Sequence, residues 1–206
     1  MGRNVGAVLA TALSMFAAVV LMSTSALLVP ASALATRAKP KSKACANTNL
    51  LPTAANAATI DAATLCLIDR VRAASHLRPL RFNPELQAVA ATQVSEMVRW
   101  NYFADNSPSG QTPATLIEAT SYAAHATRLA TGQNIAWGTG VDATPAFVVA
   151  AWMSSPPHRE LILTAAYRDA GVSATPAVPS VVESAPGATY AVEFGARGRG
   201  AKHAPA

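Results

Sequence analysis

The feature that most constrains this sequence is an apolar run over residues 5–29, close to the start of the chain. Arg3 precedes the run, and Ala33-Leu34-Ala35 follows it. A charged start, an apolar middle and a small-residue cleavage site are typical of a secretory signal peptide, here residues 1–35. The alternative is a membrane anchor, because about 25 apolar residues can span a bilayer as a helix. Pro30 and the Ala-Leu-Ala site favour cleavage.

Removal of the signal peptide leaves 171 residues, enough to bury the core of one domain. We divide them into a basic, Ala/Pro-rich leader (36–59), a folded domain (60–196) and a flexible basic tail (197–206). No second apolar span follows, so we expect no membrane span after cleavage. We expect a secreted, extracellular monomer that could associate with the cell wall.

The formal net charge of +5 is concentrated at the two ends of the mature chain. Residues 44–196 carry eight Arg and Lys against eleven Asp and Glu, a net charge of −3. This acidic domain argues against a nucleic-acid partner. Basic ends suit attraction to anionic wall polymers or lipid head groups. The alternative is that the ends are solvated tails without a partner.

The two cysteines, Cys45 and Cys66, both follow the cleavage site. An even number of cysteines in an exported chain favours a disulfide, whereas two buried free thiols are the alternative. The bridge would attach the leader to the first predicted helix. Closing a loop of about 20 residues would stabilise the fold by on the order of 3 kcal/mol.

The spacing of apolar residues and the helix-start signals predict helices in the first part of the folded domain and strands in the last part. The first predicted helix runs over 61–75, with Asp61 as its N-cap and a turn at His76. The second begins at Asn83-Pro84-Glu85, and the third and fourth run over 113–122 and 145–153. A short fifth helical turn begins at Ser155-Pro156 and carries His158. The predicted strands are 170–174 and 189–194, the latter with Tyr190, Val192 and Phe194 on one face. This segregation indicates an α+β fold.

Five polar residues in loops beside apolar helices form the candidate site: Asp105, Gln133, Asn134, His158 and Arg159. His158 can titrate near neutral pH or ligate a metal. Each of the five also has an ordinary structural explanation in turn formation or backbone hydrogen bonding. The sequence contains no GxSxG, P-loop, HExxH or GxGxxG motif.

Six segments in order resemble the CAP superfamily of cysteine-rich secretory, antigen 5 and pathogenesis-related proteins (SCP-like domains), in its bacterial exported form. The segments are Leu67-Ile68-Asp69-Arg70-Val71-Arg72, Leu80 with Asn83-Pro84-Glu85-Leu86, Phe103 with Ser107-Pro108-Ser109-Gly110, Gly132-Gln133-Asn134-Ile135-Ala136, Ala151-Trp152-Met153-Ser154-Ser155-Pro156-Pro157-His158-Arg159, and Ala170-Gly171-Val172. The resemblance implies a three-layer α-β-α sandwich around a small, largely antiparallel sheet, with a wide polar cleft.

The resemblance also implies a cleft in which two histidines and a glutamate meet and, in some members, hold a divalent metal. His158 matches the second histidine, whereas Asp105 stands in place of the first and Gln133 in place of the glutamate. Leu116 replaces a common arginine, and Gln93 a common histidine. One imidazole, one aspartate and an amide make a poor zinc site, so His158 is a weak metal candidate.

Two functions from different classes follow. The first is a non-catalytic extracellular binding module for a wall polymer, a lipid or sterol-like ligand, or a host molecule, without a cofactor. The second is a hydrolase that uses His158 and Asp105 in acid/base or metal-assisted (zinc or magnesium) catalysis. Five aromatic residues near the same loops suit an apolar or sugar ligand: Trp100, Tyr102, Phe103, Trp137 and Trp152.

Overall fold

The computed structural model describes residues 44–180 and 187–199. The chain divides into two units, Met1–Pro40 and Lys41–Ala206, and the described residues all belong to the second. The predicted signal peptide and the start of the predicted leader therefore lie outside the described residues.

Proline and a capping side chain define most helix starts. In chain order the elements are α1 (Ala57–Ala74), β1 (Arg81–Phe82), α2 (Pro84–Arg99), α3 (Pro113–Glu118), β2 (Ala126–Thr139), the 3₁₀ helix η1 (Gly140–Ala143), α4 (Pro145–Ser154), α5 (Pro156–Leu163), β3 (Asp169–Thr175) and β4 (Gly187–Arg199). Helices α2 to α5 each begin at a proline, whose fixed φ suits the first turn. Asn83 Oδ1 caps α2 by accepting from the backbone N–H groups of Glu85 and Leu86, both at 3.0 Å.

The four strands form one sheet in the order β1-β3-β4-β2. The short β1 pairs in parallel with β3, and the other two pairings are antiparallel. The sheet is therefore mixed, and the prediction of a largely antiparallel sheet is confirmed for its long strands. The pairing of β2 with β4 extends from Thr139 opposite Gly187 to Ala126 opposite Arg199.

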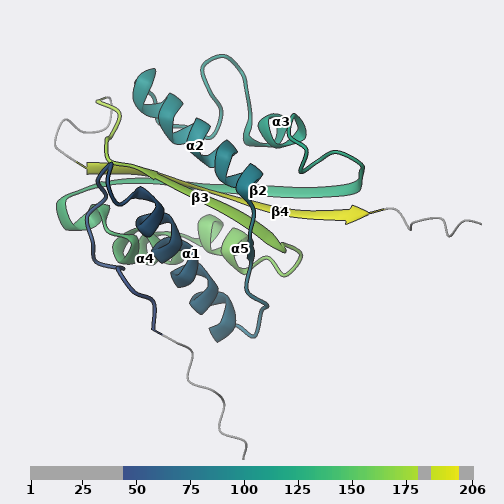
Figure 1. Ribbon diagram of the computed structural model, residues 1–206, viewed down its shortest axis with the longest axis horizontal. Helices are drawn as coiled ribbons and strands as arrows, with labels where there is room; N and C mark the ends of the chain where they lie inside the picture. Colours follow the sequence, from purple (N-terminus) through teal and green to yellow (C-terminus); the bar gives the residue numbers. More distant parts are fainter. Residues whose placement is uncertain (1–43, 181–186, 200–206) are drawn as a thin grey trace, which may run out of the picture. The chain divides into compact units, whose positions relative to one another are not determined.

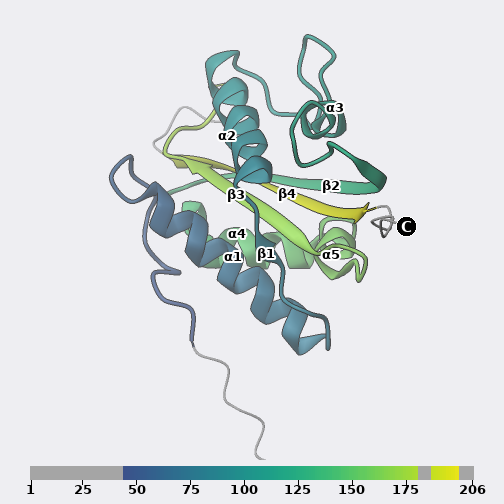
Figure 2. The same ribbon diagram turned by 45° about the vertical axis from the view of Figure 1, so that its right-hand side comes forward.

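Helices cover both faces of the sheet, which confirms the predicted α-β-α sandwich. Helices α1, α4 and α5 lie on one face, and α2 and α3 lie on the other (Figures 1 and 2). Tyr190, Val192 and Phe194 of β4 point into the core under α1 and α4, whereas Ala191 packs with α2. Helix α2 lies directly on β3, because a Cβ at Gly171 would overlap the backbone of Leu86 and Gln87. None of the described helices is long and apolar enough to cross a membrane.

Several sequence predictions needed correction at the ends of elements. Asp61 is not an N-cap, because α1 begins at Ala57 and Asp61 instead accepts from the backbone of Ala174. The predicted third helix does not reach Tyr122 but ends at Glu118, since Tyr122 turns inward and donates to Asp169 Oδ2 at 2.9 Å. Strand β4 continues beyond Ala196, the predicted end of the domain, because β2 pairs with it there.

The largest omission from the sequence prediction is β2, which precedes α4 and α5 and so interrupts the expected order of helices before strands. The disulfide between Cys45 and Cys66 is confirmed, with their Cα atoms 5.8 Å apart. The turn after α1 is confirmed as well, with His76 at a φ of 59°. Near the disulfide, Thr48 O accepts from Ala146 N at 2.9 Å, which joins the segment before α1 to α4.

One buried guanidinium joins segments that are far apart in the sequence. Arg72 near the end of α1 is 0% exposed. Its Nη1 donates to the carbonyl oxygens of Ile162 at 2.7 Å and Thr164 at 3.0 Å, and its Nε donates to Arg78 O at 3.0 Å. Arg72 thereby fixes the end of α1 to the end of α5 and to the chain that enters β1.

Replacement of Arg72 by methionine should destabilise the protein by about 3–5 kcal/mol, because it leaves the buried Ile162 carbonyl and the part-buried Thr164 and Arg78 carbonyls without their donor. The matched control is Arg70→Met on the same helix, where the side chain is exposed and the change should stay within about 0.5 kcal/mol. Urea unfolding of the three proteins measures both differences. Equal midpoints for the two variants would contradict this role of Arg72.

Candidate functional site

A cleft of about 450 Å³ lies beside β2, the edge strand of the sheet. Its walls come from the loop after α2, from β2, and from the junction of α4 with α5. Asp105 and His158 both line this cleft, together with Phe103, Trp137 and Ser155. The structure therefore brings the two principal sequence candidates to one site.

Asp105 is placed by a buried amide beneath its loop. Gln93 on α2 is 1% exposed, and its Nε2 donates to the backbone oxygens of Ala104 at 3.2 Å and Asp105 at 2.9 Å. The Asp105 residue itself is exposed. Gln93, identified in the sequence only as a departure from the family pattern, thus holds the loop while the aspartate side chain faces the cleft.

His158 lies in the first turn of α5 and is half-buried. Its Nδ1 is 2.6 Å from Ser155 Oγ, and its backbone oxygen accepts from Asn134 Nδ2 at 3.0 Å. Because Asn134 is 0% exposed on β2, this bond fixes the start of α5 against the sheet. With Nδ1 engaged by Ser155, Nε2 is the ring nitrogen left for a ligand.

Gln133 makes its contact with a residue that the sequence analysis did not identify. Its Nε2 donates to Glu193 Oε1 at 2.5 Å, and the two residues face each other across the β2–β4 pairing. Glu193 is 0% exposed. Among the described residues, Glu193 Oε2 and Gln133 Oε1 are buried and have no hydrogen-bond partner. At the position where the family resemblance implies a glutamate, the chain thus has an amide with a carboxyl group opposite it.

The environment of Glu193 keeps this carboxyl group uncharged at neutral pH. Burial raises the pKa of Glu193 to about 8, and the negative charge of Asp105 adds to the increase, while the hydrogen bond from Gln133 opposes it. A glutamate inside the otherwise apolar strand 189–194 is the signal by which the sequence could have revealed this group.

Arg159 and two of the tryptophans that the sequence analysis placed near the site have other positions or contacts in the structure. Arg159 is exposed, and its Nη1 donates to Met153 O at 3.2 Å. Trp152 is a core residue, 2% exposed, whose Nε1 donates to Ile135 O at 3.0 Å. Trp100 is 46% exposed at the end of α2 and does not line the cleft.

The side chains present do not fit the two-histidine, one-glutamate metal site of the family. The described residues contain no group of three His, Cys, Asp or Glu side chains placed to hold a metal ion. His158 Nδ1 is bonded to Ser155, and the Gln133 amide is bonded to Glu193. One imidazole and one exposed carboxylate are too few ligands for a zinc site.

The fold is a three-layer α-β-α domain, and comparison with known proteins agrees with this architecture. Residues 65–178 match the family model described as "CAP: Cysteine-rich secretory protein family". The chain belongs to this family. No curated protein matches the sequence significantly.

Solved structures resemble the chain at low sequence identity. An outer surface protein from Borrelia burgdorferi has a TM-score of 0.52 and 21% identity, over 65% of this chain and 90% of its own. An extracellular SCP-domain protein from Bacillus anthracis strain Ames has a TM-score of 0.49 and 21% identity, over 68% of this chain and 40% of its own. A cysteine-rich secretory protein from Staphylococcus aureus strain Mu50 has a TM-score of 0.48 and 18% identity, over 69% of this chain and 40% of its own.

The raised pKa of Glu193 makes stability depend on pH. In the unfolded chain Glu193 loses its proton near pH 4.5, whereas in the folded protein it keeps the proton to about pH 8. The free energy of unfolding should therefore fall between these values, by roughly 1 kcal/mol per pH unit from this group. Asp61, with its pKa raised by burial to about 6, adds a decrease over a lower range.

Glu193→Gln keeps an acceptor for Gln133 and removes the titration, so it should flatten the decrease between pH 6 and pH 8. Denaturant unfolding at several pH values measures the slopes. Glu118→Gln, at an exposed position of α3, should keep the wild-type slope. A Glu193→Gln slope equal to that of wild type would show that Glu193 is ionised in the folded protein.

Proposed function

We propose that this protein is an exported, non-catalytic binding module whose cleft takes a saccharide segment of a cell-wall polymer. The observation that carries the proposal is the composition of the cleft. Phe103 and Trp137 are half-buried and line it, with Asp105 and His158 at the same site. Aromatic faces beside a few polar groups suit a ligand with apolar C–H faces and hydroxyl groups.

The internal hydrogen bonds of the site support binding over catalysis. Gln133 and Glu193 bond to each other, and the Asn134 amide bonds to the backbone of His158. None of these three side chains lines the cleft, so they are not placed to exchange protons with a substrate bound there. Asp105 and His158 Nε2 remain to accept or donate hydrogen bonds to ligand hydroxyls.

The basic ends of the chain support a wall polymer as the ligand. The predicted export signal would place the domain outside the cytoplasm, and the basic residues flank an acidic folded part. Attraction of the ends to an anionic polymer would raise the local concentration of saccharide near the cleft.

The alternative is a hydrolase, and one contact favours it. Ser155 Oγ lies 2.6 Å from His158 Nδ1 and lines the cleft with Asp105, which is an arrangement of hydroxyl, imidazole and carboxylate. However, Pro156 and Pro157 follow Ser155 directly and have no N–H. The start of α5 therefore lacks the backbone donors that would stabilise an oxyanion next to Ser155.

Calorimetric titration with soluble peptidoglycan fragments tests the proposal. Wild-type protein should bind the fragments, and Trp137→Ala should bind at least about tenfold more weakly, because it loses a stacking face. The matched control is Trp100→Ala, at an exposed tryptophan outside the cleft, which should bind like wild type.

The same samples distinguish binding from hydrolysis. After incubation, chromatography of the fragments should show them unchanged if the protein is a binding module. New products that disappear with Ser155→Ala or His158→Ala would establish the hydrolase instead. Absence of binding, or equal loss of affinity in Trp137→Ala and Trp100→Ala, would overturn the cleft as a saccharide site.

A further inference from the structure

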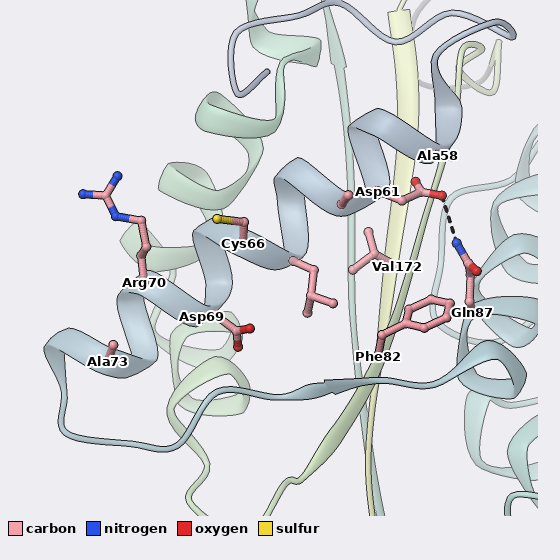
Figure 3. A pocket seen from close by; sticks show the side chains of 11 residues that line it. Ala58, Asp61, Cys66, Asp69, Arg70, Ala73, Phe82, Gln87 and Val172 are labelled. Carbon is pink, nitrogen blue, oxygen red and sulfur yellow. Dashed lines mark hydrogen bonds between the residues drawn. The ribbon is translucent and has the colours of Figure 1, made fainter. Parts of the chain in front are cut away.

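A second, larger hollow lies at the opposite edge of the sheet from the cleft. It has a volume of about 630 Å³, within the usual range of about 300–1,000 Å³ for small-molecule sites. Helix α1 forms one side, and Phe82 of β1, Val172 of β3 and Gln87 of α2 form the other (Figure 3). We call this hollow the α1 groove. Because the strand order is β1-β3-β4-β2, the α1 groove and the cleft beside β2 are separate sites.

The α1 groove is lined by a stripe of α1 that differs from the core-facing stripe. The core stripe contains Ile60, Ile68 and Arg72, all 0% exposed. The groove stripe repeats at helical spacing and is made mostly of small residues: Ala58, Ala62, Leu65, Cys66 and Ala73. Small side chains on α1 leave room in front of Phe82, which is 57% exposed.

Two carboxyl groups stand along this apolar stripe. Asp61 and Asp69 both line the groove, and they are separated by eight positions, or about 12 Å along the helix axis. Arg70 also lines the groove, but its side chain extends away from Phe82 and Val172 (Figure 3). The interior of the groove is therefore apolar with negative charge at two places.

Both carboxyl groups are held in place by backbone hydrogen bonds. Asp61 accepts from Ala174 N at 2.9 Å and from Gln87 Nε2 at 3.1 Å. Asp69 Oδ1 accepts from Leu80 N at 2.8 Å. Fixed acceptors lose little conformational entropy when a ligand binds, which favours a ligand of matching charge.

We propose that the α1 groove binds a cationic amphiphile, an aliphatic chain that ends in a protonated amine. The chain would lie against Leu65, Phe82 and Val172, and the amine would bond to Asp61 or Asp69. Negative charge beside an apolar surface excludes an anionic fatty acid of the same length and favours the amine. The site is independent of the proposed saccharide cleft.

The charges around the groove give the interaction a pH dependence. Burial raises the pKa of Asp61 to about 6, and burial also raises the pKa of Asp69. Arg72 lies near Asp69, and its positive charge partly offsets the increase in the pKa of Asp69. Arg70 also lines the groove, and Tyr190 is close to Asp61 on the core side. Amine binding should weaken as pH falls through about 6, since Asp61 then takes up a proton.

The test uses three ligands with the same chain length and different head groups: decylamine, 1-decanol and decanoate, each below its aggregation limit. Calorimetric titration at neutral pH should show the tightest binding for decylamine and at least about tenfold weaker binding for decanoate. Asp61→Asn/Asp69→Asn should remove the preference for decylamine over 1-decanol.

A groove-filling variant keeps the test independent of the carboxyl groups. Ala62→Trp places a large ring in the groove from an exposed helix position, and it should abolish decylamine binding. The matched control is Ala91→Trp, at an exposed position of α2, which should bind like wild type. Absence of decylamine binding, equal affinity for decylamine and decanoate, or unchanged binding in Ala62→Trp would overturn the proposal.

Discussion

The antiparallel pairing of β2 with β4 is the constraint on which the fold and the cleft both depend. It joins the edge strand to the centre of the sheet and sets Gln133 opposite Glu193. Because side chains alternate along a strand, a shift of β4 by one residue would turn Glu193 into the core under α1 and α4 and place Val192 on the face covered by α2. The register that completes the hydrophobic core is thus also the register that pairs the Gln133 amide with the buried Glu193 carboxyl group.

Sequence reasoning recovered the helices well because their signals are local. The start at Asn83-Pro84-Glu85 carries its own cap, and the proline starts of α3 to α5 are equally explicit. Strand β2 was missed because its burial alternates only weakly, as expected for an edge strand with polar residues on both faces. The pairing of Gln133 with Glu193 was missed for a related reason, since it depends on a register between strands that are far apart in the sequence.

The candidate site was predicted in part. Asp105 and His158 do share the cleft, as the family resemblance implied, but the contact between Ser155 and His158 and the buried Glu193 became visible only in the structure. The substitution of Gln133 for the family's glutamate is accompanied by a carboxyl group on the adjacent strand, which is kept protonated by burial. The cleft therefore keeps its place in the fold while its charge pattern has changed, which is the central point of our account.

The most direct test of this account is a zinc titration of the wild-type protein beside the triple variant Asp105→His/Gln133→Glu/Glu193→Gln. The third change removes the carboxyl group that would otherwise repel the new glutamate at position 133. The account predicts that the wild-type protein binds no zinc in the cleft and that the triple variant binds one equivalent, because the variant carries the two histidines and the glutamate that the family resemblance implies. Zinc binding by the wild-type protein that is lost on His158→Ala, or a triple variant that folds but binds no zinc, would contradict it.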